Sequence, residues 1–233
     1  MTDPVLLLVA HGTRNPAGVE TIARLADAVA GALSDSTHGP SVRVAFVDVL
    51  GPSPADVLRD LPADAPVIAV PAFLASGYHV HADLPREITE SGHRHVHVTP
   101  AIGPDPALAQ VMGERLRDTG LRPADRVVLA AAGSSDVRAL ADVRTAADQL
   151  GTVVGRPVEV AYVAMHWRGH STVMQDRTAY ADVVTDVAAE LRARLDAARA
   201  AGIAADRLVV DAGYGFAKTG EHNWALLQHP EVL

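Results

Sequence analysis

Apolar runs about as long as β-strands alternate with amphipathic stretches along the first half of the chain. The runs are nearly continuous, which is typical of strands buried on both faces of a parallel sheet. We expect strands at residues 5–10, 42–49, 66–73 and 95–99. Between the first two, Val19, Ile22 and Ala26 follow the helical period, and another helix is expected after the turn at residues 51–54. Strands that alternate with helices predict an α/β fold on a parallel sheet.

The same plan restarts in the second half of the chain. Residues 127–134 repeat the pattern of residues 6–13, and residues 158–163 repeat that of residues 42–47. Two agreements in the same order indicate an internal duplication joined at residues 120–125. We therefore expect two lobes, residues 1–120 and 121–233. Ala132 stands in the second lobe where the first has His11, so we expect the first lobe to carry the chemistry.

Composition narrows the chemistry that is available. The chain has no cysteine, which excludes disulfides, thiolate zinc sites and cysteine nucleophiles. A net charge of −8 disfavours nucleic acid as a partner. No apolar run approaches the roughly 20 residues needed to cross a bilayer, and no basic segment precedes residues 5–10, so we expect a cytoplasmic protein without a signal peptide. With eleven histidines and no cysteine, the ligands of any metal site are expected to be imidazole and carboxylate groups.

Two of these histidines follow expected strands. His11 ends the first strand, and His79 lies a few residues beyond the third. Ligands of open parallel sheets bind beyond the carboxyl ends of the strands, so both side chains are expected at the same edge. Two imidazoles there could hold a divalent metal or accept protons near neutral pH. The alternative is that His11 caps a helix and His79 is an ordinary surface residue.

Other histidines have simpler explanations. His93, His95 and His97 alternate along the expected fourth strand and so share one face. That face is either an accessory metal site or a polar strand surface, and we favour the polar surface. His81 is either a third ligand beside His79 or only its neighbour.

Three segments resemble a known family. The segments are LVAHGTR at residues 8–14, VDVLGPSP at 47–54 and PAFLASGYHV at 71–80. Together they are similar to the class II tetrapyrrole chelatases of the CbiX/SirB type, in the two-lobed form, over about residues 4–164. The resemblance implies flavodoxin-like lobes and insertion of Fe²⁺ or Co²⁺ into sirohydrochlorin for sirohaem or cobalamin. It assigns the family's catalytic and metal-binding histidines to His11 and His79, with the metal as substrate and no tightly bound cofactor.

The polycarboxylate substrate implied by this resemblance calls for cationic and N–H donors. Arg14 and Arg86 are the candidate cations, the alternative being that both are solvated surface charges. Ser76, Gly77 and Tyr78 belong to the motif that contains His79 and complete the expected substrate-binding set.

The last third of the chain resembles a different family. MHWRGHS at residues 165–171, VMQ at 173–175 and DAGYGFAKTGEHNWALL at 211–227 are similar to dihydropteroate synthase. In that family the equivalent of Asp211 hydrogen-bonds the pterin, but Ala212 replaces the usual proline. About 69 residues cannot close a barrel of about 250, so we do not expect synthase activity. The second lobe is therefore expected to be atypical, chelatase-like over 121–164 and synthase-like over 165–233.

This tail can still complete a sheet. Val183, Val187 and Leu191 lie along one face of an expected helix between Thr178 and Ala201, before a short buried strand at residues 208–210. Without the last strand and helix usual in a chelatase lobe, the second lobe can be incomplete and expose a sheet edge, which carries a risk of aggregation or of homodimer formation.

We therefore expect a sirohydrochlorin metal chelatase whose partners are a tetrapyrrole and a divalent metal. One alternative is a non-catalytic metal or tetrapyrrole binder, because the second lobe is altered. A less favoured alternative is residual pterin binding through Asp211. The sequence leaves open the choice between iron and cobalt, and which histidine is ligand and which is base.

Overall fold

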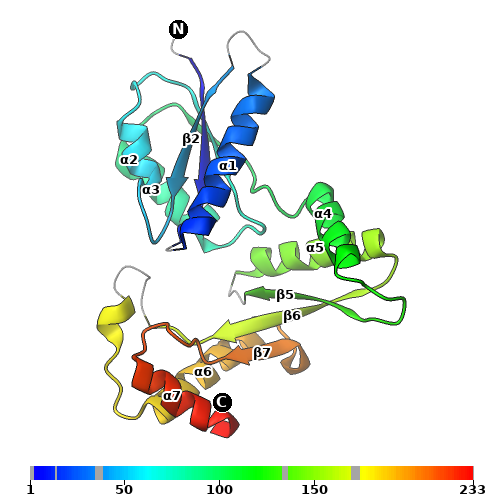
Figure 1. Cartoon of the computed structure of the whole chain (residues 1–233). Helices are drawn as coiled ribbons and strands as arrows, with labels where there is room; N and C mark the ends of the chain where they lie inside the picture. The colour runs from blue at the N-terminus through cyan, green and yellow to red at the C-terminus, as the bar shows by residue number, and fades with distance from the viewer. Residues whose placement is uncertain (1–2, 14, 35–38, 133–135, 169–173, 233) are drawn as a thin grey trace. The chain divides into compact units, whose positions relative to one another are not determined.

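The computed structural model describes residues 3–13, 15–34, 39–132, 136–168 and 174–232. It divides into two compact units, Met1–Pro104 and Asp105–Leu233, each with its own parallel sheet (Figure 1). In the part of the chain that the structure describes, no helix is long and apolar enough to cross a membrane.

The first unit is a four-stranded parallel sheet with helices between its strands. Its elements are β1 (Val5–Ala10), α1 (Pro16–Leu33), β2 (Ser41–Phe46), α2 (Pro54–Arg59), β3 (Val67–Pro71), the π-helical turn η1 (His79–Asp83), α3 (Leu84–Ser91) and β4 (Val96–Val98). The strand order is β2-β1-β3-β4, and all three pairings are parallel. The expected α/β fold on a parallel sheet is confirmed.

The core of the first unit lies between the sheet and helices α2 and α3. Leu7 of β1 and Leu84 of α3 are fully buried there, together with Leu58 of α2. Helix α1 lies on the other side of the sheet (Figure 1) and has no fully buried residue. Burial of β1 on both faces explains its continuous apolar run, because four of its last five residues are fully buried.

The second unit is a three-stranded parallel sheet with the order β5-β6-β7. Its main elements are α4 (Pro106–Asp118), β5 (Val127–Ala132), α5 (Val137–Val154), β6 (Val158–Met165), α6 (Val183–Ala200), β7 (Leu208–Asp211) and α7 (Gly220–Gln228). Short 3₁₀ turns lie at η2 (Met174–Arg177), η3 (Ala205–Arg207) and η4 (Pro230–Val232). Helix α4 packs against α5. Helix α6 begins later than expected, because the Asp182 side chain accepts a hydrogen bond from the Thr185 amide and caps it.

The tail is packed into the second sheet. Strand β7 pairs with β6 in register, with Tyr162 opposite Leu208 and Met165 opposite Asp211. One apolar cluster joins Leu140 and Tyr162, which precede residue 165, to Ile203, which follows it. The expectation that the synthase-like tail adds a strand and helices to the second sheet is confirmed.

Candidate active site at the carboxyl edge of the first sheet

His11 directly follows β1, in a tight turn from strand to helix. The turn passes so close to the segment after β2 that a Cβ on Gly12 would lie 1.8 Å from the carbonyl oxygen of Asp48. Helix α1 then begins at Pro16, where the Asn15 side chain accepts a hydrogen bond from the Ala17 amide at 3.0 Å. A glycine at this position and a capped helix behind it hold His11 at the strand end.

His79 is held by a carboxylate one helical turn further along. Its Nδ1 lies 2.7 Å from Oδ2 of Asp83, and Arg86 binds the other oxygen of the same carboxylate at 2.9 Å. Asp83 is only 7% exposed. Buried carboxylates are normally paired, and here the partners are one imidazole and one guanidinium. The charge of Asp83 raises the pKa of Arg86.

The fold brings the two expected histidines together. The ring centroids of His11 and His79 lie 5.1 Å apart, with the ring planes at 78°. Phe73 stacks beside His79 at 6.1 Å, and Tyr78 meets its edge at 6.3 Å. The edge rule for parallel sheets thus places both imidazoles correctly, although many residues separate them in the chain.

Hydrogen-bond partners define the tautomers of both rings. Nδ1 of His11 lies 2.8 Å from the carbonyl oxygen of Gly12, which can only accept, so His11 donates through Nδ1–H. His79 likewise donates through Nδ1–H to the Asp83 carboxylate. Among the described residues, Nε2 of neither ring has a hydrogen-bond partner, so this nitrogen can take either a metal ion or a proton.

The structure places the expected substrate-binding residues as follows. Arg14 lies outside the described residues. The Arg86 side chain is half exposed and pairs with Asp83. The Gly77 carbonyl accepts the amides of Val80 and His81 and so starts the turn η1. Tyr78, which follows Ser76 and Gly77, is 61% exposed beside the His79 ring.

The outer histidines are not spaced along a strand as expected. Strand β4 begins only at Val96, so His97 lies in it, and His93 and His95 precede it. His93 donates through Nε2 to the Pro62 carbonyl at 3.2 Å and accepts the His95 amide at Nδ1. Its ring thus closes a turn that precedes β4. Within the described ranges, no three or more His, Asp or Glu side chains converge as a metal site.

Two features of this edge were not anticipated. Asp83 was not singled out, although its position four residues after His79 in a helical segment is a usable signal. The second feature is Val49, which adopts φ 69° directly after Asp48. A β-branched residue in the left-handed region is strained, and nothing in its side chain would have predicted the turn.

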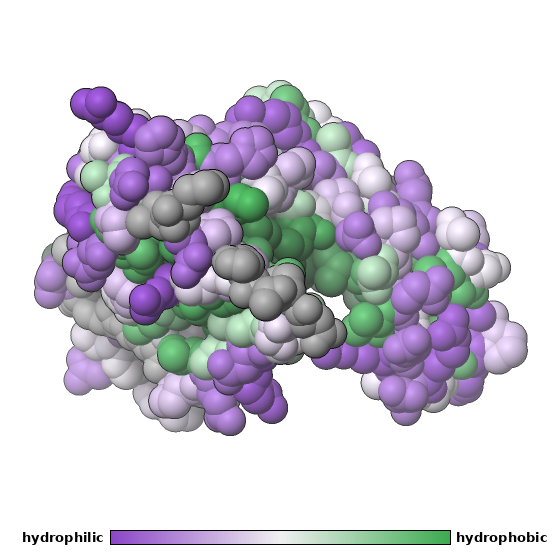
Figure 2. Space-filling model, turned by 90° about the horizontal axis from the view of Figure 1, so that it is seen from above, coloured by the Kyte–Doolittle hydropathy of each residue, from purple (hydrophilic) through white to green (hydrophobic). Residues whose placement is uncertain are grey.

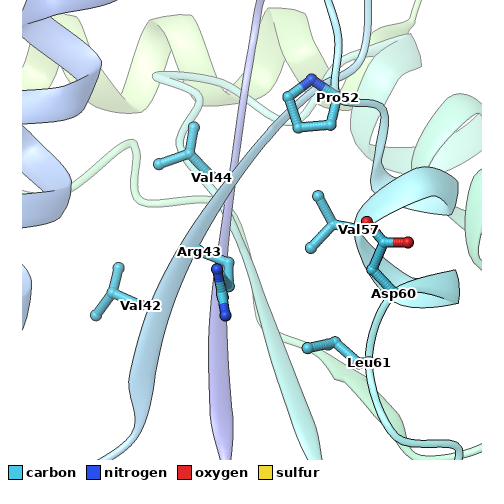
Figure 3. Close-up of a pocket in the computed structure, with 7 residues that line it drawn as sticks. All are labelled: Val42, Arg43, Val44, Pro52, Val57, Asp60 and Leu61. Atoms are coloured by element: carbon cyan, nitrogen blue, oxygen red, sulfur yellow. The ribbon is translucent and has the colours of Figure 1, made fainter.

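A separate cavity of about 350 Å³ lies along the open edge of β2. Figure 3 shows Val57, Asp60 and Leu61 turned toward the strand that carries Arg43. Neither histidine of the pair lines it, so it does not belong to the candidate site.

Two family models match different parts of the chain. The CbiX model matches residues 5–119, and the model of pterin binding enzymes matches residues 127–233. The chain is thus similar to one family over its first half and to another over its second. The expected chimera-like resemblance is confirmed, with the pterin-binding match beginning ahead of Met165.

Solved structures match the whole chain in fold. SirB from Bacillus subtilis with Fe³⁺ superposes with a TM-score of 0.58 at 18% identity, covering 99% of this chain and 95% of that one. The CbiX structure described as the terminal enzyme of siroheme biosynthesis in denitrifying bacteria gives 0.52 at 20% identity, covering 97% and 98%. At such identities the likeness shows the fold, and it confirms two chelatase-like lobes.

The curated relatives are similar to the part of the chain that resembles pterin binding enzymes. Dihydropteroate synthase of Mycobacterium leprae is 51% identical over 76 residues, which are 32% of this chain and 27% of that protein. The enzyme of Neisseria meningitidis serogroup C is 39% identical over 82 residues, 35% of this chain and 29% of that protein. The chain spans less than a third of the length of these two relatives.

Proposed function

We propose that the first unit is a tetrapyrrole chelatase site, which takes up Fe²⁺ or Co²⁺ and inserts it into a sirohydrochlorin-type macrocycle. The observation that carries the proposal is the contact of His11 and His79 at 5.1 Å, with Nδ1 of each ring engaged and Nε2 left over. The CbiX match over residues 5–119 supports the same reaction class.

Metal insertion requires ligands that hold the metal weakly enough to release it, and two imidazoles meet this requirement. The metal must shed its ligands one at a time, and two pyrrole N–H protons must leave the macrocycle. Imidazole binds Fe²⁺ and Co²⁺, and an imidazole without metal accepts protons near neutral pH. The Asp83 carboxylate orients the His79 ring through its hydrogen bond and leaves Nε2 as the acceptor, so we assign His79 the proton-accepting role and His11 the first contact with the metal.

The surroundings of the pair suit a flat, largely apolar ring with a polar rim. Leu74 and Tyr78 are 68% and 61% exposed, more than large apolar side chains usually are. Phe73 stacks beside His79 behind them. Figure 2 shows hydrophobic residues exposed among hydrophilic ones on the surface. We propose that Leu74 and Tyr78 contact the face of the macrocycle while its carboxylates meet Arg14 and backbone amides.

The test is anaerobic incubation with sirohydrochlorin and either Fe²⁺ or Co²⁺, followed by absorption spectroscopy. The His11→Ala, His79→Ala double variant is expected to lose at least about 100-fold in rate, the lower range of general acid–base contributions. His229→Ala, which replaces an exposed histidine of the second unit, is the control and should stay within about twofold. Equal rates for wild type and double variant would overturn the proposal. Saturable metal or tetrapyrrole binding without turnover would select the non-catalytic alternative.

Replacing Asp83 by asparagine tests the assigned role of His79. Asparagine presents an acceptor to one neighbour and a donor to the other, so the contact with His79 or the contact with Arg86 is lost. We expect kcat to fall about 10- to 100-fold, the usual effect of removing a partner behind a functional histidine. Glu90→Gln, which removes the distant partner of Arg86 at 3.8 Å, should leave kcat unchanged.

A second candidate function is pterin binding by the second unit. It is favoured by the pterin-binding match over residues 127–233 and by Asp211 at the end of β7, whose Oδ1 accepts the Gly213 amide at 2.7 Å. Titration with a pterin should show saturable binding to the wild type that Asp211→Ala weakens at least tenfold. Identical titrations would remove this candidate and leave the chelatase proposal untouched.

A further inference from the structure

The chain contains a single lysine, Lys218, among its 20 basic residues. This lysine is only 5% exposed, although lysine is rarely buried without partners. It lies between β7 and α7 in the second unit, far along the chain from the histidine pair. Neither proposed function uses it.

Lys218 folds back onto its own loop. Its Nζ lies 2.8 Å from Nδ1 of His166, 3.0 Å from the Gly213 carbonyl oxygen and 3.0 Å from that of Phe216. An ammonium group has three donors, so these three acceptors satisfy it completely. We call residues 211–219 the Lys218 loop.

The backbone of this loop is bent closely around the lysine. Gly213 has φ 64°, and a Cβ there would lie 1.9 Å from the carbonyl oxygen of His166. Ala217 also has a positive φ, 54°, is fully buried, and accepts the Tyr180 hydroxyl at 2.9 Å. A positive φ costs free energy at alanine. The contacts of Lys218 offset part of that cost.

His166 is the group on which the loop closes. It is 0% exposed, and both ring nitrogens are engaged. Nε2–H donates to Oε2 of Glu190 at 2.9 Å, while Nδ1 accepts from Lys218. The ring is therefore neutral in the closed loop. A second proton would sit on Nδ1 and face the ammonium at hydrogen-bonding distance.

We propose that Lys218 and His166 hold the Lys218 loop closed, and that protonation of His166 opens it. The loop carries Asp211 and exposes Tyr214 and Phe216, so opening rearranges the surface at the end of β7. Lys218 and His166 are thus positioning residues for whatever this edge of the second unit binds.

The charges around His166 agree in sign with this proposal. Burial and then the charge of Lys218 lower the pKa of His166, Glu190 of α6 opposes them, and Arg194 of α6 adds to the lowering. Arg168 engages Glu190 and so weakens its opposition, and Tyr180 lies beside the ring. In an open loop the pKa returns toward its ordinary value of about 6.5. The open loop then binds the extra proton more strongly, so the closed loop loses stability as pH falls below about 6.5.

The pKa of Lys218 is also lowered in the closed loop. Burial lowers its pKa to about 8, with Glu190 and Asp211 opposing and Arg168 and Arg194 adding to the lowering. An exposed lysine titrates near 10.5, so between these values the closed loop gains stability as pH rises. Below about pH 7.5 Lys218 is mostly an ammonium group whether the loop is closed or open, so the pH dependence in that range comes from His166.

Hydrogen exchange of the full chain, followed by mass spectrometry, tests the proposal. Rates in peptides from 212–219 are divided by the intrinsic rate at each pH, and helix α5 serves as the internal reference. Between about pH 7.5 and about pH 5, protection of the wild-type loop should fall, by roughly 30-fold at most if closed His166 takes no proton. Protection of α5 should stay constant.

Two variants should abolish this pH dependence, one with the loop closed at both pH values and the other with it open at both. In His166→Gln the amide can accept from Lys218 and donate to Glu190 but cannot be protonated, so the loop should stay protected at both pH values. In Lys218→Met the ammonium is gone, and the loop should be unprotected at both, while α5 remains protected in a folded chain. General destabilisation cannot produce both results. A wild-type loop equally protected at both pH values, or a pH-dependent His166→Gln loop, would overturn the proposal.

Discussion

Replacing Gly12 by alanine is expected to lower the free energy of unfolding of the first unit by about 3 kcal/mol, the upper part of the usual range for overpacking. The new Cβ would lie 1.8 Å from the Asp48 carbonyl oxygen and 3.0 Å from the Leu50 amide nitrogen. Both atoms are backbone, so no side chain can move aside. Strands β1 and β2 are paired up to Ala10 and Phe46, which leaves the turn little freedom to shift.

The same substitution should separate the two imidazoles. His11 is the neighbour of Gly12 and uses its carbonyl, so a displaced turn moves the ring away from His79. We expect chelatase activity to fall along with stability. Urea unfolding followed by circular dichroism measures stability, and the absorption assay measures activity.

Gly31 is the matched control for this experiment. It lies in α1, and a Cβ there would meet no atom within 4 Å. Gly31→Ala should therefore stabilise the protein by about 0.5–1 kcal/mol, because alanine is the better helix former. If Gly12→Ala unfolds at the same urea concentration as Gly31→Ala, the close approach of the two turns is wrong.

Truncating Leu226 to alanine should cost the second unit about 2–5 kcal/mol. Leu226 of α7 is 0% exposed and packs with Val187, Leu191 and Ala212. The cavity would remove packing contacts between α7 and α6. Both helices belong to the synthase-like tail. A loss of this size would show that the tail forms a cooperative core.

The chain supplies both a probe and a control for this measurement. Its two tryptophans, Trp167 and Trp224, both lie in the second unit, so tryptophan fluorescence follows unfolding of that unit. Leu227 adjoins Leu226 and is 52% exposed, so Leu227→Ala should change the free energy by less than about 0.5 kcal/mol. Equal midpoints for the two variants would mean that the tail lacks the core described here.

Parts of this molecule follow from local rules that need no neighbours. The continuous run at residues 5–10 implied a strand buried on both faces, and the edge rule for parallel sheets placed His11 and His79 together. Both inferences use only the period of apolar residues and the direction of strands.

Other parts depend on contacts that no local pattern encodes. The left-handed Val49 follows from the approach of Asp48 to Gly12, which are distant in sequence. The burial of Lys218 depends on His166 lying across from it, which requires the pairing of β6 with β7. The sequence does contain one usable signal for this site: Lys218 is its single lysine, and all other Lys/Arg positions are arginine.

The packing of α4 against α5 also bears on how two such segments fit together. The CbiX match ends at residue 119 and the pterin-binding match begins at residue 127, so the second sheet lies within the pterin-binding match. Helix α4 is then the part of the CbiX match that packs in the second unit. A parallel ladder is made of backbone groups and needs no particular side chains, so a joint in the turn before β5 leaves it intact. The side chains between α4 and α5, such as Arg117, which donates to the Val153 carbonyl at 3.1 Å, should record the adaptation of one segment to the other.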